Sequence, residues 1–585
     1  MYKKCYQGDK VQGLKNTWEM HLWESDGEHK KILYEDFAYI ECDKSEETMK
    51  SITGESLKPT LDFFYTRGKN KHKNTPGLYW ADMRSSNEIH QKFLIGEYGT
   101  NDEPSTGHQE MFFDIECEML DSFEPDEIAK ANKTITSIAF YHKQADKWGC
   151  IVLDPKGIVK VDPNAKQQVA TFKTEKALLE CWVQIIIDSK PDSLIGYNSD
   201  NFDMPYLYWR IVNICGKDRA DQMSPLYGYV NQPVKARADQ NSFFTRTGFF
   251  VDIKGIESLD YMRLHKKYGW QDEPSWKLDA IGEKYVGINK IEYEGNLDSL
   301  FESDINKFIQ YNFVDVEILV ELDKKLEYLA LTKNLSHKGK HNYSEVYANT
   351  NTQDGAISAY LLSQNIIPPA KDMNLKAEKG YAGGYLFCPK AGIYNYMFDE
   401  DLTSLYPSII MSLNIGKETL KARIIDADDR NNRLGLNDLK SKDPNSTVII
   451  KNNKGKRAEV TITNLLKFID SNKFTISANG TMFSTNRQSV LSTILAKWFQ
   501  ERVIYKGEMK KAFKAGDKES GTKFHLLQYT MKILLNSLYG ATALPSFRYG
   551  NVNLSKAITL SGQRIIQESA LIANKKMNKE IKNVK

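Results

Sequence analysis

Short apolar runs and helical runs alternate through the middle of this chain, and this alternation constrains the fold more than any other feature. The runs Met111–Phe113 and Ser193–Gly196 are short and mostly apolar, as in buried strands. Between them, residues 175–189 have the pattern of a helix. Strands that alternate with helices are typical of a sheet covered by helices. The sequence therefore predicts an α/β domain from residue 111 to about residue 320.

Turn-forming segments mark boundaries on either side of this domain. Residues 1–107 alternate β-type runs with charged stretches, and Asn101–Gly107 is typical of a linker. The two glycines of Tyr381–Gly384 mark a second boundary. Residues 426–457 are polar and are predicted to be a loop, and the pattern becomes helical after Arg487. We therefore expect several domains.

Composition excludes little. The 79 Lys and Arg against 76 Asp and Glu give a net charge of only +3, so any nucleic-acid surface would be a local basic face. The seven cysteines form no Cys-x-x-Cys pair, which disfavours structural zinc and a disulfide framework. The chain has no run of about 18 apolar residues, and Met1–Lys4 leads into no apolar export segment. We expect a cytoplasmic protein that does not bind a membrane.

Acidic residues recur within the predicted α/β domain. Asp114 and Glu116 are two apart on a predicted strand and therefore point to one face. Residues 198–205 add further acids, and Tyr311 and Asp315 are four apart on a predicted helix. Alone, each pair fits a solvated surface. Acids that converge would raise one another's pKa, so divalent ions are the natural compensation, and hydrolysis of a phosphodiester with two metal ions needs this arrangement.

A second candidate site surrounds Asp401. It follows the apolar run Tyr394–Phe398, which predicts a strand, and Pro407 suits the first turn of a helix. Such a carboxylate can hold Mg²⁺ while nearby backbone N–H groups face a triphosphate. An isolated Asp-x-x-Ser would more simply be a helix cap, so the choice between a cap and a metal ligand depends on the longer motif around Asp401.

A third set of residues lies on two predicted helices, and Gly540 is expected to end the second of them. Residues at spacings of four and seven share a helix face. The set consists of Arg502 and Lys506 on the first helix and Lys532, Asn536 and Tyr539 on the second. Cations there would meet phosphates, although the first pair alone equally fits an ordinary basic surface.

Together these segments resemble family B DNA polymerases over nearly the whole chain. The runs Asp401–Ile410 and Lys532–Gly540 resemble two of the three polymerase motifs, and Ala557–Gln563 supports them. The three acidic segments resemble, in the same order, the family's three exonuclease motifs. The chain looks most like the polymerases of T-even-like bacteriophages.

The resemblance implies a role for each candidate residue. The family pattern has an aromatic residue directly before the second-motif acid, which selects Asp203 over Asp200. Tyr311 would orient the attacking water, and Tyr406, beside Ser404 and Leu405, would close the sugar pocket against a 2′-hydroxyl. The ligands of Mg²⁺, or of Mn²⁺, would be Asp114, Glu116, Asp203 and Asp315 in the exonuclease site and Asp401 in the polymerase site. The residues that contact the incoming nucleotide would be Arg502, Lys506, Lys532, Asn536 and Tyr539.

The resemblance also implies a multidomain protein of α/β and α+β class. The expected parts are an N-terminal domain (1–107, with 336–380 returning to it), a ribonuclease-H-like 3′–5′ exonuclease domain (108–335), a first part of the palm (381–485), helical-hairpin fingers (486–540) and a truncated second part of the palm (541–585). Turn residues within 231–248 permit a strand-separating hairpin.

The third polymerase motif is not found, because Gly540–Lys585 contains no Asp-x-Asp pair. Nucleotidyl transfer with two metal ions needs a second carboxylate. We therefore expect a DNA polymerase subunit with a proofreading exonuclease, which replicates phage DNA in the infected host and polymerises only with a second chain that carries this motif and the thumb. Its other partners would be primer–template and single-stranded DNA, deoxynucleoside triphosphates and, through the second chain, a sliding clamp. The alternatives are a truncated protein with exonuclease activity alone and a non-catalytic DNA-binding relic.

Overall fold

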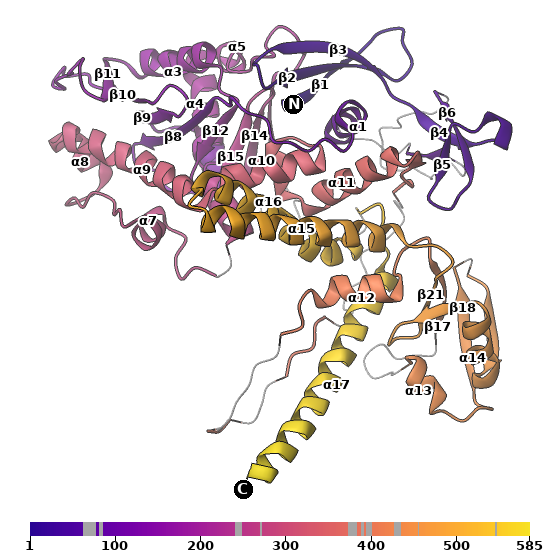
Figure 1. The fold of residues 1–585 in the computed structure, drawn as a ribbon. Helices are drawn as coiled ribbons and strands as arrows, with labels where there is room; N and C mark the ends of the chain where they lie inside the picture. Colours follow the sequence, from indigo (N-terminus) through magenta and orange to yellow (C-terminus); the bar gives the residue numbers. More distant parts are fainter. Residues whose placement is uncertain are drawn as a thin grey trace. The chain divides into compact units, whose positions relative to one another are not determined.

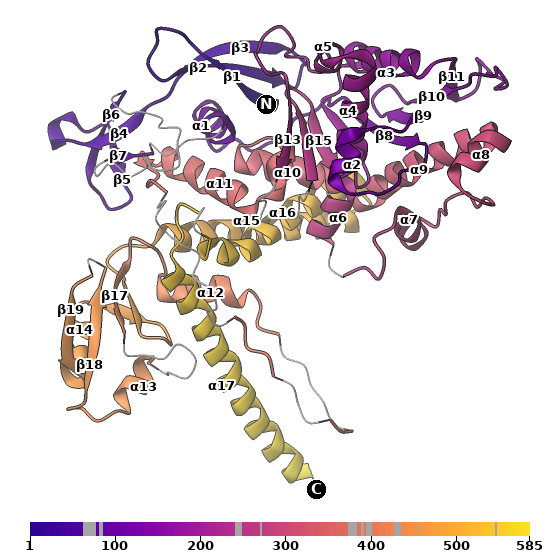
Figure 2. The ribbon, with the colours of Figure 1, turned by 180° about the vertical axis from the view of Figure 1, so that it is seen from behind.

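The computed structural model divides the chain into two compact units (Figures 1 and 2). Unit 1 comprises Met1–Asp36 and Ser85–Ala348, and unit 2 comprises Phe37–Arg84 and Asn349–Lys585. The structure describes residues 1–61, 78–80, 86–239, 248–269, 272–371, 383–387, 391–393, 401–425, 434–453, 455–544 and 547–584. The five domain boundaries expected from the sequence stay a prediction.

A six-stranded mixed sheet lies at the centre of unit 1, in the order β11-β10-β9-β8-β12-β15. Strand β9 is antiparallel to both of its neighbours, whereas β8, β12 and β15 are parallel. The strands are β8 (Glu110–Cys117), β9 (Ile135–His142), β10 (Lys147–Leu153), β11 (Gln167–Phe172), β12 (Ser193–Gly196) and β15 (Glu257–Asp260). The two strands predicted from their apolar runs are thus confirmed, as is the helix α3 (Glu175–Ser189).

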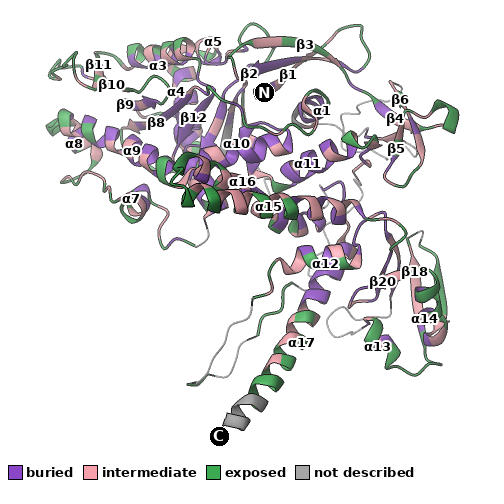
Figure 3. Ribbon diagram, in the orientation of Figure 1, coloured by how far each residue is buried: buried purple, intermediate pink, exposed green. Residues whose placement is uncertain are grey.

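The alternation of β8 separates an apolar face from an acidic one. Met111, Phe113 and Ile115 are buried in one core with Trp182 of α3, and the rings of Phe113 and Trp182 lie 5.9 Å apart. The residues between them point to the opposite face, because side chains alternate along a strand. There the long helix α9 (Ile305–Leu326) contacts β8 and β9, and its inner side is buried (Figure 3). The acids of β8 therefore face α9.

The remaining elements of unit 1 surround this sheet. A second, antiparallel sheet contains β1 (Tyr2–Lys10), β2 (Thr17–Glu24) and β3 (His29–Glu35), and a separate ladder pairs β13 (Val234–Asp239) with β14 (Gly248–Ile253). The tip of the possible strand-separating hairpin, 240–247, lies outside the described residues. The helices are α1 (Ser86–Tyr98), α2 (Pro125–Lys130), α4 (Asp203–Cys215), α5 (Lys217–Asp221), α6 (Tyr261–Tyr268), α7 (Leu278–Val286), α8 (Leu297–Ser303), α10 (Tyr328–Gly339) and the 3₁₀ turn η2 (Tyr343–Tyr347).

Unit 2 contains two five-stranded sheets. The first has the order β16-β5-β6-β4-β7 and the second the order β19-β18-β17-β21-β20. The first consists of β4 (Ala38–Glu41), β5 (Met49–Ser51), β6 (Ser56–Thr60), β7 (Leu78–Tyr79) and β16 (Ile366–Ile367), with the 3₁₀ turn η1 (Lys44–Glu46). The second consists of β17 (Leu420–Ile424), β18 (Thr447–Asn452), β19 (Arg457–Thr461), β20 (Phe474–Ile476) and β21 (Thr481–Ser484), with α13 (Leu436–Lys440) and α14 (Ile462–Ser471).

Helices form the rest of unit 2, and α15 and α16 lie side by side as a hairpin (Figure 1). The hairpin turns at Gly516, whose φ is +80°. Ser489 and Asp517 cap the two helices by accepting the backbone N–H groups of Ser492 and Ser520. The helices are α11 (Asn349–Ser363), α12 (Leu405–Leu413), α15 (Val490–Lys514), α16 (Lys518–Thr542) and α17 (Val552–Val584). The expected α/β and α+β multidomain class is confirmed.

Two predictions of local structure were wrong. The polar stretch 426–457 is not a loop where it is described, because Leu439 is fully buried on α13 and β18 carries the β-branched run Val448–Ile450. Gly540 does not end its helix, since α16 continues to Thr542. The last turn is held by the buried side chains of Leu538 and Ala541. The strand expected at Tyr394–Phe398 lies outside the described residues.

Across the ranges that the structure describes, no helix is both long enough and apolar enough to cross a lipid bilayer.

A buried ion pair joins distant segments of unit 2. The Arg548 guanidinium, which is 1% exposed, donates from Nε to Asp354 Oδ1 at 2.9 Å. Its Nη1 donates to the Pro369 carbonyl at 2.7 Å, and Lys371 Nζ lies 3.6 Å from the Asp354 carboxylate. The pair fixes the segment before α17 to α11.

We expect Arg548→Met to destabilise the protein strongly, because it removes the guanidinium that donates hydrogen bonds to the buried Asp354 carboxylate. Loss of one partner of a buried pair typically costs about 3–5 kcal/mol. The combined variant Arg548→Met with Asp354→Leu should recover much of that loss, because it leaves no buried carboxylate without its guanidinium partner. Calorimetric unfolding of both variants tests this, and equal melting temperatures for the parent and Arg548→Met would contradict it.

Candidate active site

Four acids gather at the end of β8 in unit 1. Asp114 and Glu116 extend from β8 and Asp315 from α9, and one carboxylate oxygen of each lies within 4.8 Å of the others. Asp203 is the first residue of α4, and its Oδ1 accepts the backbone N–H of Ile115 at 3.3 Å. One strand and two helices thus bring together acids that are far apart in the sequence, from residue 114 to residue 315.

Burial and mutual repulsion raise the pKa values of these acids. Burial, followed by the charge of Asp315, raises the pKa of Glu116 to about 8. Burial raises the pKa of Asp203 to about 7, against two backbone N–H groups that lower it. Burial raises the pKa of Asp114 far above its usual range, and Asp315, Asp203 and Glu116 raise it further. The cluster therefore carries more negative charge than its surroundings compensate.

Lys290 is the cation that faces this cluster. Its ammonium donates to Asp315 Oδ2 at 2.5 Å and to the Tyr311 hydroxyl at 3.1 Å, and it lies 4.9 Å from the centre of the Tyr311 ring. Burial lowers the pKa of Lys290, but the charges of Asp315 and Asp114 outweigh burial, so that the pKa is raised overall. Lys290 therefore stays charged and ties the tyrosine and acid of α9 together.

The donor set suits a divalent cation. Asp315 Oδ1 is buried and has no hydrogen-bond partner among the residues that the structure describes. Three carboxylates converge there, and within the described part of the chain one lysine, Lys290, pairs with them. Small hard cations such as Mg²⁺ and Mn²⁺ prefer carboxylate oxygens, so the residues present fit a metal site.

Asp200, the alternative acid of the second segment, belongs to a different cluster. Its carboxylate pairs with Arg263, and Ser258 Oγ donates to it at 3.3 Å. The Arg263 guanidinium stacks 3.8 Å from the centre of the Tyr347 ring. Asp200 thus has its own cation, whereas Asp203 lies against β8 with the other three acids.

Sequence analysis missed two residues beside the acids, Lys290 and Asn312. Lys290 lies between α7 and α8, where no local pattern distinguishes it from other lysines. Asn312 directly follows Tyr311, and its amide donates to Asp114 Oδ2 at 2.8 Å. The one signal in the sequence that could have identified Asn312 is its position directly after Tyr311 on the predicted helix.

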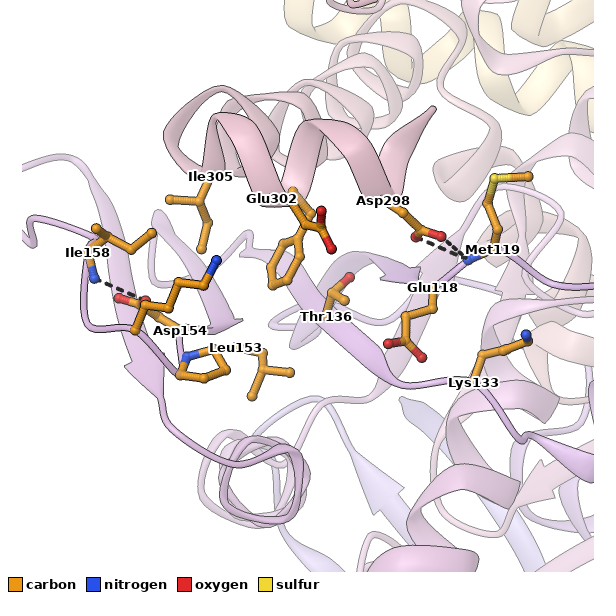
Figure 4. Close-up of a pocket in the computed structure, with 13 residues that line it drawn as sticks. Glu118, Met119, Lys133, Thr136, Leu153, Asp154, Ile158, Asp298, Glu302 and Ile305 are labelled. Carbon is orange, nitrogen blue, oxygen red and sulfur yellow. Dashed lines mark hydrogen bonds between the residues drawn. The ribbon is translucent and has the colours of Figure 1, made fainter. Parts of the chain in front are cut away.

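A cavity of about 460 Å³ opens beyond the acids at the end of β8 (Figure 4). Glu118 lines it two residues after Glu116, and Thr136 also lines it while donating to the Glu116 carbonyl at 3.1 Å. At the same end of the cavity, Asp298 of α8 accepts the Met119 N–H at 3.2 Å (Figure 4). Acids and apolar side chains both line this space.

The second candidate site lies in unit 2, where Asp401 is exposed four residues before α12. Ser404 has a φ of +54°, an uncommon conformation for a residue with a side chain, and forms the cap of α12. The Tyr406 ring lies 4.5 Å from the Tyr539 ring of α16. A Cβ on Gly562 of α17 would lie 2.9 Å from Tyr406 Cε1, so this close approach requires a glycine. The half-buried Tyr406 of α12 thus contacts both α16 and α17.

The expected phosphate-binding cations gather on the α15–α16 hairpin. Burial lowers the pKa of Lys532, and the charges of Arg502 and Lys506 lower it further. Arg502 Nε is buried without a hydrogen-bond partner among the described residues. Asn536 is exposed on the same helix as Lys532. Asp401, in contrast, makes no ion pair with any residue that the structure describes, and it is exposed.

Comparison with known proteins shows the family to which the chain belongs. Residues 87–281 match the family model "DNA polymerase family B, exonuclease domain", and residues 350–585 match "DNA polymerase family B". The first match covers Asp114, Glu116 and Asp203, and the second covers Asp401 and the α15–α16 hairpin. The chain belongs to DNA polymerase family B.

Its relatives include phage and archaeal enzymes. The DNA-directed DNA polymerase of Escherichia phage RB69 is 28% identical over 445 residues, which are 68% of this chain and 45% of that relative. The DNA-directed DNA polymerase of Enterobacteria phage T4 is 25% identical over 462 residues, 70% of this chain and 46% of that relative. DNA polymerase 1 of Saccharolobus solfataricus is 25% identical over 291 residues, 45% of this chain and 29% of that relative. The matched part therefore spans less than half the length of these relatives.

The raised pKa of Glu116 predicts how the metal-free protein responds to pH. Its folded pKa, about 8, lies above the ordinary value of 4.5, so this carboxyl stabilises the fold while protonated and that stability is lost as the pH rises from about 4.5 to 8. Glu116→Gln should therefore melt a few degrees above the parent at pH 8.5 in EDTA, and the advantage should shrink at pH 4.5. Saturating Mg²⁺ should reduce it at pH 8.5. A melting-temperature difference that is the same at both pH values would contradict this account.

Proposed function

We propose that unit 1 removes nucleotides from the 3′ end of single-stranded DNA and so proofreads synthesis. The observation that carries this proposal is the meeting of Asp114, Glu116, Asp203 and Asp315 next to Tyr311. Folding does not require four clustered acids, and their burial has an energetic cost. The match to the family's exonuclease model supports the same reaction.

The four acids would hold two Mg²⁺ or Mn²⁺ ions. Bound there, such ions activate a water molecule and stabilise the leaving oxygen. The Tyr311 hydroxyl, fixed by Lys290, would orient the attacking water. Lys290 would also keep the Asp315 carboxylate in place and offset its charge.

The direct test is digestion of a 5′-labelled single strand by the purified chain. We expect stepwise loss from the 3′ end that depends on Mg²⁺ or Mn²⁺. Asp114→Ala with Glu116→Ala should reduce it by about 10³-fold or more without unfolding the protein, because it removes metal ligands and relieves repulsion. The matched control is Glu124→Ala with Asp126→Ala, two exposed acids at the same spacing. Undiminished digestion by the first variant would refute the assignment.

We further propose that unit 2 forms part of a nucleotidyl-transfer site. Asp401 would bind Mg²⁺, and Tyr406, with Ser404 and Leu405, would exclude the 2′-hydroxyl of a ribonucleotide. The contacts of Tyr406 with Tyr539 and Gly562 support this role, because they leave the ring little freedom. The incoming deoxynucleoside triphosphate would be bound by Arg502, Lys506 and Lys532, with Asn536 and Tyr539 at the nascent base pair.

Synthesis by this site would need a second metal-binding carboxylate from further polypeptide. Residues 541–585 contain no aspartate, and in-line transfer between two bridging metal ions requires acids on both sides. We propose a second chain that carries the third motif, the thumb and the contact to a sliding clamp. Leu571 and Ile572 of α17 are each 68% exposed, which supports an apolar interface there of about 2,000 Å² or more. The assembly would replicate phage DNA in the infected host, as its relatives' sources suggest.

Primer extension distinguishes this enzyme from a chain with exonuclease activity alone. The experiment uses the variant Asp114→Ala with Glu116→Ala, so that exonuclease activity does not degrade the primer. We expect no template-directed extension by the 585 residues alone, and extension once a polypeptide with the third motif and thumb is added. Asp401→Asn should abolish that extension. Robust synthesis by the 585 residues alone would refute the need for further polypeptide.

A further inference from the structure

We propose that Ser137 and Asn312 form a relay that positions the Asp114 carboxylate for the metal ion. This inference rests on the proposed exonuclease function and adds two positioning residues to it. Ser137 lies on β9 and Asn312 on α9, and both side chains are completely buried. Neither residue type titrates or binds Mg²⁺ strongly, so sequence motifs for acids do not include them.

The relay is a chain of two short hydrogen bonds. Ser137 Oγ donates to Asn312 Oδ1 at 2.8 Å, and Asn312 Nδ2 donates to Asp114 Oδ2 at 2.8 Å. Ser137 is also the cross-strand partner of Glu116 in the β8–β9 ladder. The relay therefore connects the backbone that carries Glu116 to the side chain of Asp114.

The direction of this chain is fixed by chemistry. A carboxylate that binds a metal ion is ionised and only accepts hydrogen bonds, so in that state Asn312 must turn its NH₂ group toward Asp114 and its carbonyl oxygen toward Ser137. Ser137 must then donate its single hydroxyl proton to that oxygen. An isolated amide group could rotate by half a turn. Between Ser137 and Asp114, only one orientation of the Asn312 amide forms both hydrogen bonds.

This arrangement would fix the torsion of the Asp114 carboxylate. That torsion is broad in aspartate, and three neighbouring acids repel the group. A donor on Oδ2 holds the carboxylate in one rotation and leaves Oδ1 free for other bonds. Groups that orient metal ligands in this way typically change metal affinity or activity by about 10–100-fold when they are removed.

A purely structural role makes a different prediction. If Asn312 only satisfied buried polar groups, its loss would lower the melting temperature without changing the affinity for the metal ion. If Ser137 acts through Asn312, its loss should matter only while Asn312 is present. The affinity for the metal ion, and whether the effects of the two substitutions add, therefore distinguish a positioning role from a purely structural one.

The experiment measures Mn²⁺ binding to the full chain by titration calorimetry in the absence of DNA. Binding at the exonuclease site is the difference between the parent and Asp114→Ala with Glu116→Ala. We expect Asn312→Leu to weaken that binding by about 10-fold or more, Ser137→Ala by a few-fold, and the combined variant no more than Asn312→Leu alone. The Mn²⁺ concentration that half-saturates exonuclease activity should rise in the same order. Should Asn312→Leu not fold, Ser137→Ala decides by the same measurement.

Asn334→Leu is the matched control, because Asn334 is also a buried helical asparagine and its amide donates to the Ala330 carbonyl instead of to an acid. It should leave Mn²⁺ affinity unchanged. If both relay variants bind Mn²⁺ as the parent does, the relay is refuted while the exonuclease site stands. If the parent itself binds no more Mn²⁺ than the variant without Asp114 and Glu116, the proposed exonuclease site fails, and the relay with it.

Discussion

The repulsion among four carboxylates at the end of β8 is the constraint around which unit 1 is organised. The apolar residues of β8 pack on α3, so the residues between them must face α9, where Asp315 and Tyr311 extend. Among the residues that the structure describes, Lys290 is the cation that pairs with this cluster, and burial with mutual repulsion raises the pKa values of the acids. Burying these carboxylates without cations destabilises the fold, and bound cations would offset that cost. The clustering of the four acids thus accounts for their raised pKa values and for the reaction that we propose.

The α15–α16 hairpin of unit 2 carries a cluster of cations. Arg502, Lys506 and Lys532 lie close enough on the α15–α16 hairpin to lower the pKa of Lys532, and Arg502 Nε is buried without a partner among the described residues. This is an arrangement that an anion would stabilise. The acid cluster of unit 1 and the cation cluster of unit 2 are the two features on which the proposed metal-binding and triphosphate-binding roles rest.

The sequence predicted the candidate sites better than it predicted the limits of the elements around them. The spacing of two in Asp114 and Glu116, and of four in Tyr311 and Asp315, follows from the geometry of a strand and a helix, so their shared faces could be derived in advance. Lys290 and Asn312 could not, because their importance depends on which residues meet in space. Gly540 was misjudged because burial of Leu538 and Ala541 outweighs the weak helix propensity of one glycine. The run Val448–Ile450 was overlooked because polar neighbours on both sides masked a short strand.

The central claim is that Asp114, Glu116, Asp203 and Asp315 together bind divalent metal ions. The most direct measurement is anomalous diffraction from crystals of this chain soaked in Mn²⁺ with a short single-stranded oligonucleotide. The account predicts anomalous peaks bonded to carboxylate oxygens of Asp114, Glu116 and at least one of the other two acids, with the 3′-terminal phosphate beside them. The absence of any peak at this cluster, with the crystals well ordered and Mn²⁺ bound elsewhere, would contradict it.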